Sequence, residues 1–174
     1  MRSLRLIFIL SSLLFVMTGY AQKKTDKKYA IEYGTVNSKT SKGTKNFYFI
    51  DYGNKSRSES FDTSGTLVVT QIYDGSVLYS IVGNAIDTIG PVRNAYFDSA
   101  NPEGYKKNQK FKMLPSKTIA EKQCIGFEYY SSVVNEMITI YGWNNIIMFH
   151  ESGGSKIEAI KFDDAKPSVS FTPQ

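Results

Sequence analysis

Short runs of tyrosine, phenylalanine, isoleucine, valine and threonine recur from residue 29 onward, separated by clusters of glycine, asparagine, aspartate and serine. β-Branched and aromatic side chains favour strands, and the residues of the clusters favour turns. The pattern therefore predicts a mainly β domain built on an antiparallel sheet. The predicted strands are 29–36, 45–52, 56–61, 66–73, 76–82, 85–89, 110–114, 117–119, 123–132, 136–143, 145–151, 156–162 and 168–172.

The links between the predicted strands are short. Residues that tolerate positive φ occupy the links at 52–55, 62–65, 73–76 and 152–155. Short links favour the pairing of consecutive strands, so a meander is the simplest topology. No apolar stripe of helical period extends beyond about two turns, which predicts few helices.

Residues 98–109 depart from the strand pattern. Asn101 is a possible helix cap, Pro102 suits the first helical position, and Glu103 suits the first turn. We expect a short helical insert or an ordered loop in this segment.

Three predicted strands are apolar on both faces, at 47–50, 137–141 and 146–149. A sheet with one face in water should alternate apolar and polar residues, so something covers the second face. The curled sheet itself, a helix, a partner or a lipophilic ligand would each serve as this cover. Ordinary packing of the core is the simpler alternative to a ligand site.

The N-terminus has the order of features of a cleavable secretory signal. Arg2 and Arg5 precede an apolar run at 6–17, and small residues follow it up to Ala21. The run has about a dozen residues, fewer than the roughly 20 that cross a bilayer as a helix. We expect cleavage after Ala21 and no lipid anchor, because Gln22 rather than a cysteine follows. The predicted organisation is a signal peptide at 1–21, a flexible basic leader at 22–28 and a single antiparallel β domain at 29–174.

Charge narrows the range of partners. Without the two arginines of the signal, 19 basic and 16 acidic side chains remain, a formal charge of +3. Part of this charge lies in the predicted leader, which is either solvated or in contact with anionic lipid or polysaccharide. The remaining lysines are scattered and form no stripe interleaved with aromatic residues, so we expect no nucleic-acid partner. We also expect no integral membrane span.

The chain offers little reactive chemistry. It has one histidine, His150, and one cysteine, Cys124, which excludes a metal site built from several histidines or cysteines. It has no G-x-S-x-G, G-x-G-x-x-G or phosphate-loop motif. Asp163 and Asp164 lie in a turn-like composition. We therefore expect no metal, no cofactor and no enzymatic activity, and we expect Cys124 to be a small buried apolar residue.

Three segments, in order, resemble a known family. An early strand leads to Lys-Ser-Arg-Ser-Glu at 55–59 and then to an Asp74-Gly75 hairpin. Residues 117–127 read Lys-Thr-Ile-Ala-Glu-Lys-Gln-Cys-Ile-Gly-Phe, close to the pattern K-x-I-A-G-x-x-C-x-x-Y, with Glu121 in place of the glycine. A strand with Trp143 follows, then Glu158-Ala159 and a closing Phe-Thr-Pro at 171–173.

These features resemble the periplasmic lipoprotein-carrier superfamily, with its LolA/LolB-like fold, and especially its uncharacterised bacterial relatives. The resemblance implies a location in the periplasm of a Gram-negative bacterium. It also implies a strongly curved antiparallel sheet, a meander-like half-barrel, to which the pattern at 98–109 adds a short helical insert.

Two functions remain open. The first is an exported, non-enzymatic binding protein that holds a lipid or lipoprotein acyl chain on the concave face of the sheet. Its candidate lining residues come from the strands that are apolar on both faces or near them: Phe47, Phe49, Phe127, Ile138, Ile140, Ile147 and Phe149. The alternative is a structural or interaction module of the cell envelope that binds protein or glycan through surface aromatic rings, with Tyr33, Tyr52, Tyr73, Tyr79 and Trp143 as candidates.

Overall fold

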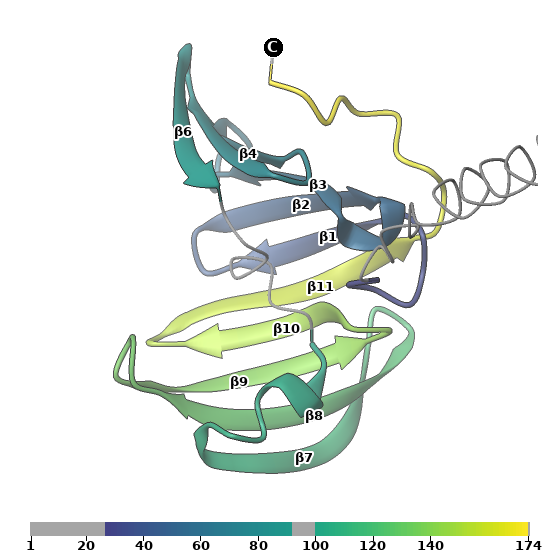
Figure 1. Cartoon of the computed structure of the whole chain (residues 1–174), viewed down its shortest axis with the longest axis vertical. Helices are drawn as coiled ribbons and strands as arrows, with labels where there is room; N and C mark the ends of the chain where they lie inside the picture. Colours follow the sequence, from purple (N-terminus) through teal and green to yellow (C-terminus); the bar gives the residue numbers. More distant parts are fainter. Residues whose placement is uncertain (1–26, 92–99, 174) are drawn as a thin grey trace, which may run out of the picture.

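The computed structural model describes residues 27–91 and 100–173. The predicted signal peptide at 1–21 and residues 22–26 of the predicted leader lie outside the described residues. Eleven antiparallel strands form one sheet (Figure 1). They are β1 (Gly34–Thr40), β2 (Gly43–Ile50), β3 (Lys55–Phe61), β4 (Leu67–Tyr73), β5 (Val77–Val82), β6 (Ala85–Pro91), β7 (Gln109–Ile119), β8 (Lys122–Ser131), β9 (Glu136–Trp143), β10 (Ile146–Ser152) and β11 (Ser155–Asp163).

The strand order confirms a mainly β fold with meander pairing in two halves. Across the sheet it runs β6-β5-β4-β3-β2-β1-β11-β10-β9-β8-β7. Every consecutive pair of strands is hydrogen-bonded except β6 and β7, which form the two edges. The halves meet where β1 pairs with β11, so the first and last strands lie side by side in the middle of the sheet (Figure 1).

Two features of the predicted fold class differ from the structure. The sheet is neither closed nor strongly curled, so it is not the half-barrel we expected (Figure 1). A sheet closes only when its edge strands meet in register, and here β6 and β7 lie at opposite ends. The helical insert is one 3-10 turn, η2 (Pro102–Gly104), in which the Asn101 side chain accepts the Glu103 N–H at 3.1 Å. The cap and proline were therefore correctly assigned, but too few residues follow to propagate an α-helix.

The ends of the domain are less regular than the pattern predicts. Residues 29–33 form no strand. Instead, the Tyr29 N–H donates to the Tyr52 carbonyl at 3.0 Å and the Ala30 N–H donates to the Asn144 carbonyl at 3.1 Å. The segment at 168–172 forms no strand either, and its Ser170 carbonyl accepts a bond from Arg57 at 3.3 Å. The predicted strands 110–114 and 117–119 are one strand, β7, whose edge position tolerates Pro115.

The core of the described residues has two parts. The first core holds the buried residues Tyr29, Val36, Phe49, Ile119, Cys124, Ile146, Met148, Phe149 and Ala159. The second core holds the buried residues Ala100, Tyr105, Phe127, Tyr129, Ile138 and Ile140. Cys124 is fully buried, which confirms the prediction for this residue.

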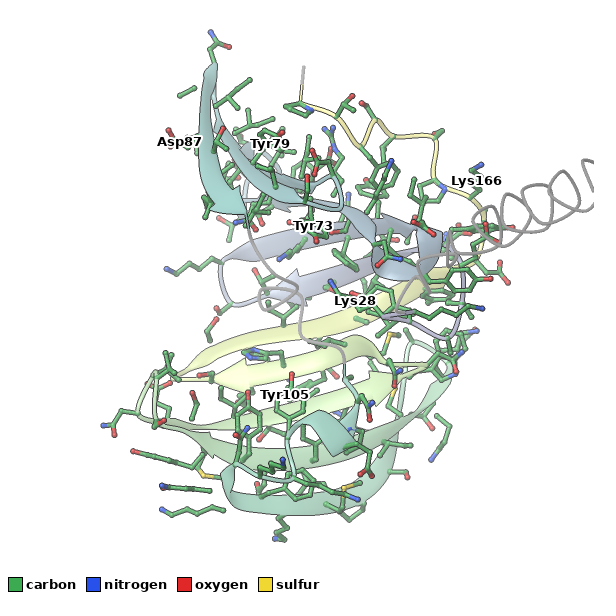
Figure 2. All side chains as sticks on the ribbon, in the orientation of Figure 1. Lys28, Tyr73, Tyr79, Asp87, Tyr105 and Lys166 are labelled. Carbon is green, nitrogen blue, oxygen red and sulfur yellow. The ribbon has the colours of Figure 1, made fainter. Side chains whose placement is uncertain are left out.

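The chain itself covers part of the second apolar face. Tyr105, just after η2, lies over the half of the sheet that contains β8 and β9 (Figure 2). Its ring centroid is 5.0 Å from that of Phe127 and 4.8 Å from that of Tyr129. Ordinary core packing therefore explains why β8 and β9 are apolar here, and no ligand is needed over them.

The turn between β4 and β5 depends on the Asp74 carboxylate. One oxygen accepts the N–H groups of Ser76 and Val77 and the Ser76 hydroxyl, all at 2.9 Å. The backbone hydrogen bond from Val77 is the main cause of a pKa below the ordinary value for this carboxyl group. Because the folded-state pKa is depressed, this stabilisation is present above about pH 4 and is lost as the pH falls through the folded-state pKa.

Replacing Asp74 with alanine is expected to lower the free energy of unfolding by about 1 kcal/mol near pH 7, because two turn amides lose their acceptor. The measurement is urea unfolding at several pH values, and the difference from wild type should shrink in acid. Asp87→Ala in the edge strand β6 is the control, since this exposed aspartate makes no such turn. Its effect should stay within about 0.5 kcal/mol. Equal losses in the two variants would show that the turn bonds are not the cause.

Candidate functional site

One face of the sheet carries a cavity of about 300 Å³. Its lining comes from β1, β2, β3, β4, β10 and β11, with one residue from the segment that precedes β1. The lining residues are Tyr29, Val36, Ser38, Lys45, Phe47, Ser58, Gln71, Ile147, His150 and Ile157. The cavity therefore spans the place where the two halves of the sheet meet.

Strand register explains why these residues share a face. Residues directly opposite each other on neighbouring strands point to the same side of a sheet. One cross-strand row passes from β1 to β4 through Val36, Phe47, Ser58 and Gln71. In the neighbouring row Ser38 lies opposite Lys45, and across β10 and β11 His150 lies opposite Ile157. The row from β1 to β4 begins with apolar side chains and ends with polar ones.

Tyr29 lines the cavity from the segment before the sheet. Its ring packs edge-on against Phe49, with centroids 4.8 Å apart, and lies 6.3 Å from Phe47. Gly53 makes room for this ring, because a Cβ at that position would lie 2.6 Å from Tyr29 carbons and the residue has a φ of +86°. The turn after β2 thus leaves the space in which the Tyr29 ring lines the cavity.

Lys45 is the charged residue of the lining. Its side chain is half-buried, and burial holds the pKa of its ammonium group below the ordinary value. None of the ten lining residues is acidic. By contrast, Lys117 and Lys156 both pair with Glu158, at 3.3 Å and 2.7 Å. The structure therefore places one partly buried lysine at a cavity, while it pairs other lysines with carboxylates.

The polar lining can orient a ligand. Ser38 and Ser58 are buried and Gln71 and His150 are half-buried, and all four carry hydrogen-bonding side chains. His150, the one histidine of the chain, is half-buried and lies in the cavity lining. Among residues 27–91 and 100–173, no group of three or more histidine, cysteine, aspartate or glutamate side chains could hold a metal ion.

The seven candidate lining residues from the sequence fall into three places. Phe47 and Ile147 line the cavity. Phe49 and Phe149 belong to the first core, and Phe127, Ile138 and Ile140 belong to the second core. The structure therefore does not bring all seven to one surface.

The sequence did not point to eight of the ten lining residues, which are Tyr29, Val36, Ile157 and the polar residues Ser38, Lys45, Ser58, Gln71 and His150. Lys45, Ser38, Ser58 and Gln71 are polar residue types that are mostly exposed in proteins, so an apolar pattern does not point to them. A usable signal was present, since Lys45 precedes Phe47 by two positions and so shares its face of the strand. The partners across the strands depend on register, which the sequence does not specify.

The aromatic rings proposed for a surface patch are not exposed. Tyr73 is buried, and Tyr33, Tyr52, Tyr79 and Trp143 are half-buried. Trp143 packs against Phe162 at 5.0 Å and is covered by the Lys122 ammonium, 4.8 Å from its ring centroid. Lys28 lies 5.3 Å from the Tyr73 ring, on the half of the sheet that carries β4 (Figure 2). These rings therefore form local contacts within the fold.

No helix within the described parts of the chain is long and apolar enough to span a membrane. The sequence matches no protein-family model and no curated protein.

Three solved structures are similar to this chain. A chain in the complex structure of Pseudomonas aeruginosa MucA/MucB is similar with a TM-score of 0.53 and 8% identity, over 78% of this chain and 53% of that chain. MucB in its complex with MucA(peri) gives a TM-score of 0.45 at 7% identity, over 79% and 52% of the two chains. LprF from Mycobacterium bovis gives 0.41 at 8% identity, over 84% and 90%. This protein thus shares its fold with a chain of the MucA/MucB complex and spans about half the length of that chain.

Proposed function

We propose that this protein is a non-enzymatic binding protein of the cell envelope that holds an acyl chain in the cavity on one face of its sheet. The observation that carries the proposal is the cavity itself, whose lining includes Val36, Phe47, Ile147 and Ile157. Each methylene that leaves water for such a site contributes about 0.8 kcal/mol. Release would be passive and would follow wherever a partner offers a better site.

The volume suits a small part of a lipid. Ligand pockets usually measure about 300–1,000 Å³, so a cavity of about 300 Å³ is at the lower end. One acyl chain of moderate length fits this space better than several chains together.

The proposal also includes export of the protein to the periplasm and membership of the lipoprotein-carrier superfamily. The signal-like order of residues 1–21 and the resemblance to the periplasmic lipoprotein carriers support a periplasmic location, with residues 29–174 as the mature β domain. A protein of the envelope is a further possible partner, because the similar chain of known structure comes from a complex of MucA with MucB. The cavity lies on an open sheet, and Tyr29, from the segment before β1, contributes to its lining.

The test is to express all 174 residues in an exporting bacterial host and purify the protein without detergent. Extraction with organic solvent and mass spectrometry should find an acyl-containing compound close to one per protein. Ile157→Trp places a larger side chain in the cavity and should abolish this signal. Ile160→Trp is the matched control, because Ile160 lies on the same strand and is 62% exposed.

A clean extract, together with no binding of added decanoate or decanol, would contradict the acyl-binding proposal. The alternative function, an interaction module of the envelope, would then take precedence. Pull-down of partners from envelope fractions would test that alternative.

A further inference from the structure

A partly buried ammonium group that forms no ion pair within the described residues lies in the proposed ligand cavity. Lys45 is on β2, where Ser38 and Ser60 lie opposite it on the two neighbouring strands. Within the described residues, its side chain forms no ion pair or hydrogen bond with another side chain or with the backbone. The residues opposite Lys45 on both neighbouring strands are therefore uncharged, and its side chain lines the cavity.

No carboxylate is among the residues that line the cavity with Lys45. Its other cavity neighbours with titratable groups are Tyr29 and His150, and neither is a carboxylate. Placing a charge out of water without a partner costs free energy, and an apolar residue would fill the same strand position without this cost. Packing of the sheet thus gives no reason for a lysine here, whereas an anionic ligand would.

The lining supplies the remaining features of an amphiphile site. Apolar side chains of Phe47, Ile147 and Ile157 line the cavity beside Lys45. Ser58, on the strand next to β2, is diagonal to Lys45 and carries a hydroxyl that can donate to an anion. One positive charge, a small number of hydroxyls and about 300 Å³ match one carboxylate on one chain.

We propose, resting on the acyl-binding function above, that the cavity selects single-chain fatty acids and that their carboxylate pairs with the Lys45 ammonium. The acyl chain lies along Phe47, Ile147 and Ile157, and the serine hydroxyls complete the hydrogen bonding of the carboxylate. A charge-assisted pair of this kind in a partly dry site favours the acid over its uncharged analogue by at least about tenfold.

The test compares matched ligands by isothermal titration calorimetry near pH 7 on the full-chain protein after purification. Decanoate and decanol have the same chain length and differ in charge. Wild type should bind decanoate at least about tenfold more tightly than decanol. Lys45→Met should reduce this ratio to about one, and Lys45→Arg should retain a preference for the acid. Lys39→Met is the control, because this exposed lysine of β1 is outside the cavity lining, and the ratio should stay as in wild type.

The outcomes distinguish a failure of the Lys45 assignment from a failure of the acyl-binding function on which it rests. Equal binding of decanoate and decanol by wild type would overturn the assignment of Lys45 and leave the acyl-binding function standing. Binding of neither ligand would count against the acyl-binding function itself. Tighter binding of didecanoylphosphatidylglycerol than of decanoate would overturn selection of single-chain acids. An unchanged ratio in Lys45→Met, with thermal unfolding showing a folded variant, would also refute the pairing.

Discussion

Replacing Phe49 with alanine is expected to lower the free energy of unfolding by about 3–5 kcal/mol, the range for a buried phenylalanine. Phe49 has no exposed surface and belongs to the first core, where its ring packs against that of Tyr29. Phe47, two residues earlier on β2, lines the existing cavity and is only half-buried. Phe47→Ala should lower the free energy of unfolding by less, about 1–2 kcal/mol. It removes less buried apolar surface than Phe49→Ala and enlarges a cavity that is already present.

Guanidinium unfolding followed by Trp143 fluorescence measures both variants, since this is the one tryptophan of the chain. The two changes should also differ in ligand binding. Phe47→Ala should weaken decanoate binding because it removes part of the lining, while Phe49→Ala should leave the affinity of the folded fraction nearly unchanged. Similar stability losses at both positions would show that Phe47 is packed as tightly as Phe49 and does not border a cavity.

The second expected result is a gain in stability. Lys45→Met should raise the free energy of unfolding of the ligand-free protein by about 1–3 kcal/mol near pH 7, because an apolar side chain of similar length replaces a partly buried, unpaired ammonium. Burial lowers the folded-state pKa of Lys45, while the unfolded chain keeps the ordinary value near 10.4. Between these two pKa values the unfolded state binds a proton that the folded state lacks. The wild type therefore becomes more stable as the pH rises through this window.

The stability advantage of Lys45→Met over wild type should shrink as the pH rises between the folded-state and unfolded-state pKa values. It should nearly vanish above the unfolded-state pKa, where lysine is neutral in both states. Urea unfolding of both proteins from pH 7 upward measures this difference. Tyr29 and His150 also line the cavity and are present in both proteins, so the difference isolates Lys45. A Lys45→Met variant that is less stable than wild type near pH 7 would mean that the ammonium is stabilised in the folded state.

Local sequence patterns predicted the strands and their turns well, because these depend on neighbours along the chain. The link after β3 is an example, since the Asp62 carboxylate accepts the N–H groups of Ser64 and Thr66 at 2.8 Å and 2.9 Å. The cap at Asn101 and the burial of Cys124 were predicted for the same kind of reason. The strand predicted at 29–36 begins only at Gly34, and the one predicted at 168–172 does not form, because aromatic and β-branched content also occurs in extended segments that pack without a ladder.

The candidate site was only partly predictable. The apolar pattern led to Phe47 and Ile147, but it equally led to five residues that fill the two cores. A core position and a cavity position both look apolar in sequence, and only the partners across the sheet separate them. Lys45 was overlooked because a lysine in a strand is usually at the surface, and its burial depends on β1, β3 and the residues of β10 and β11.

The sequence by itself determined a mainly β domain and its consecutive hairpins, because side-chain periodicity and turn chemistry act over a few residues. It also determined that the chain has only one histidine and one cysteine. Only the tertiary structure decided that β1 pairs with β11, that the sheet stays open, and that Tyr105 covers β8 and β9. Pairing between the first and last strands joins residues more than a hundred positions apart, and no local preference encodes that register. The cavity lies across this junction, so its existence and the partly buried position of Lys45 follow from long-range pairing.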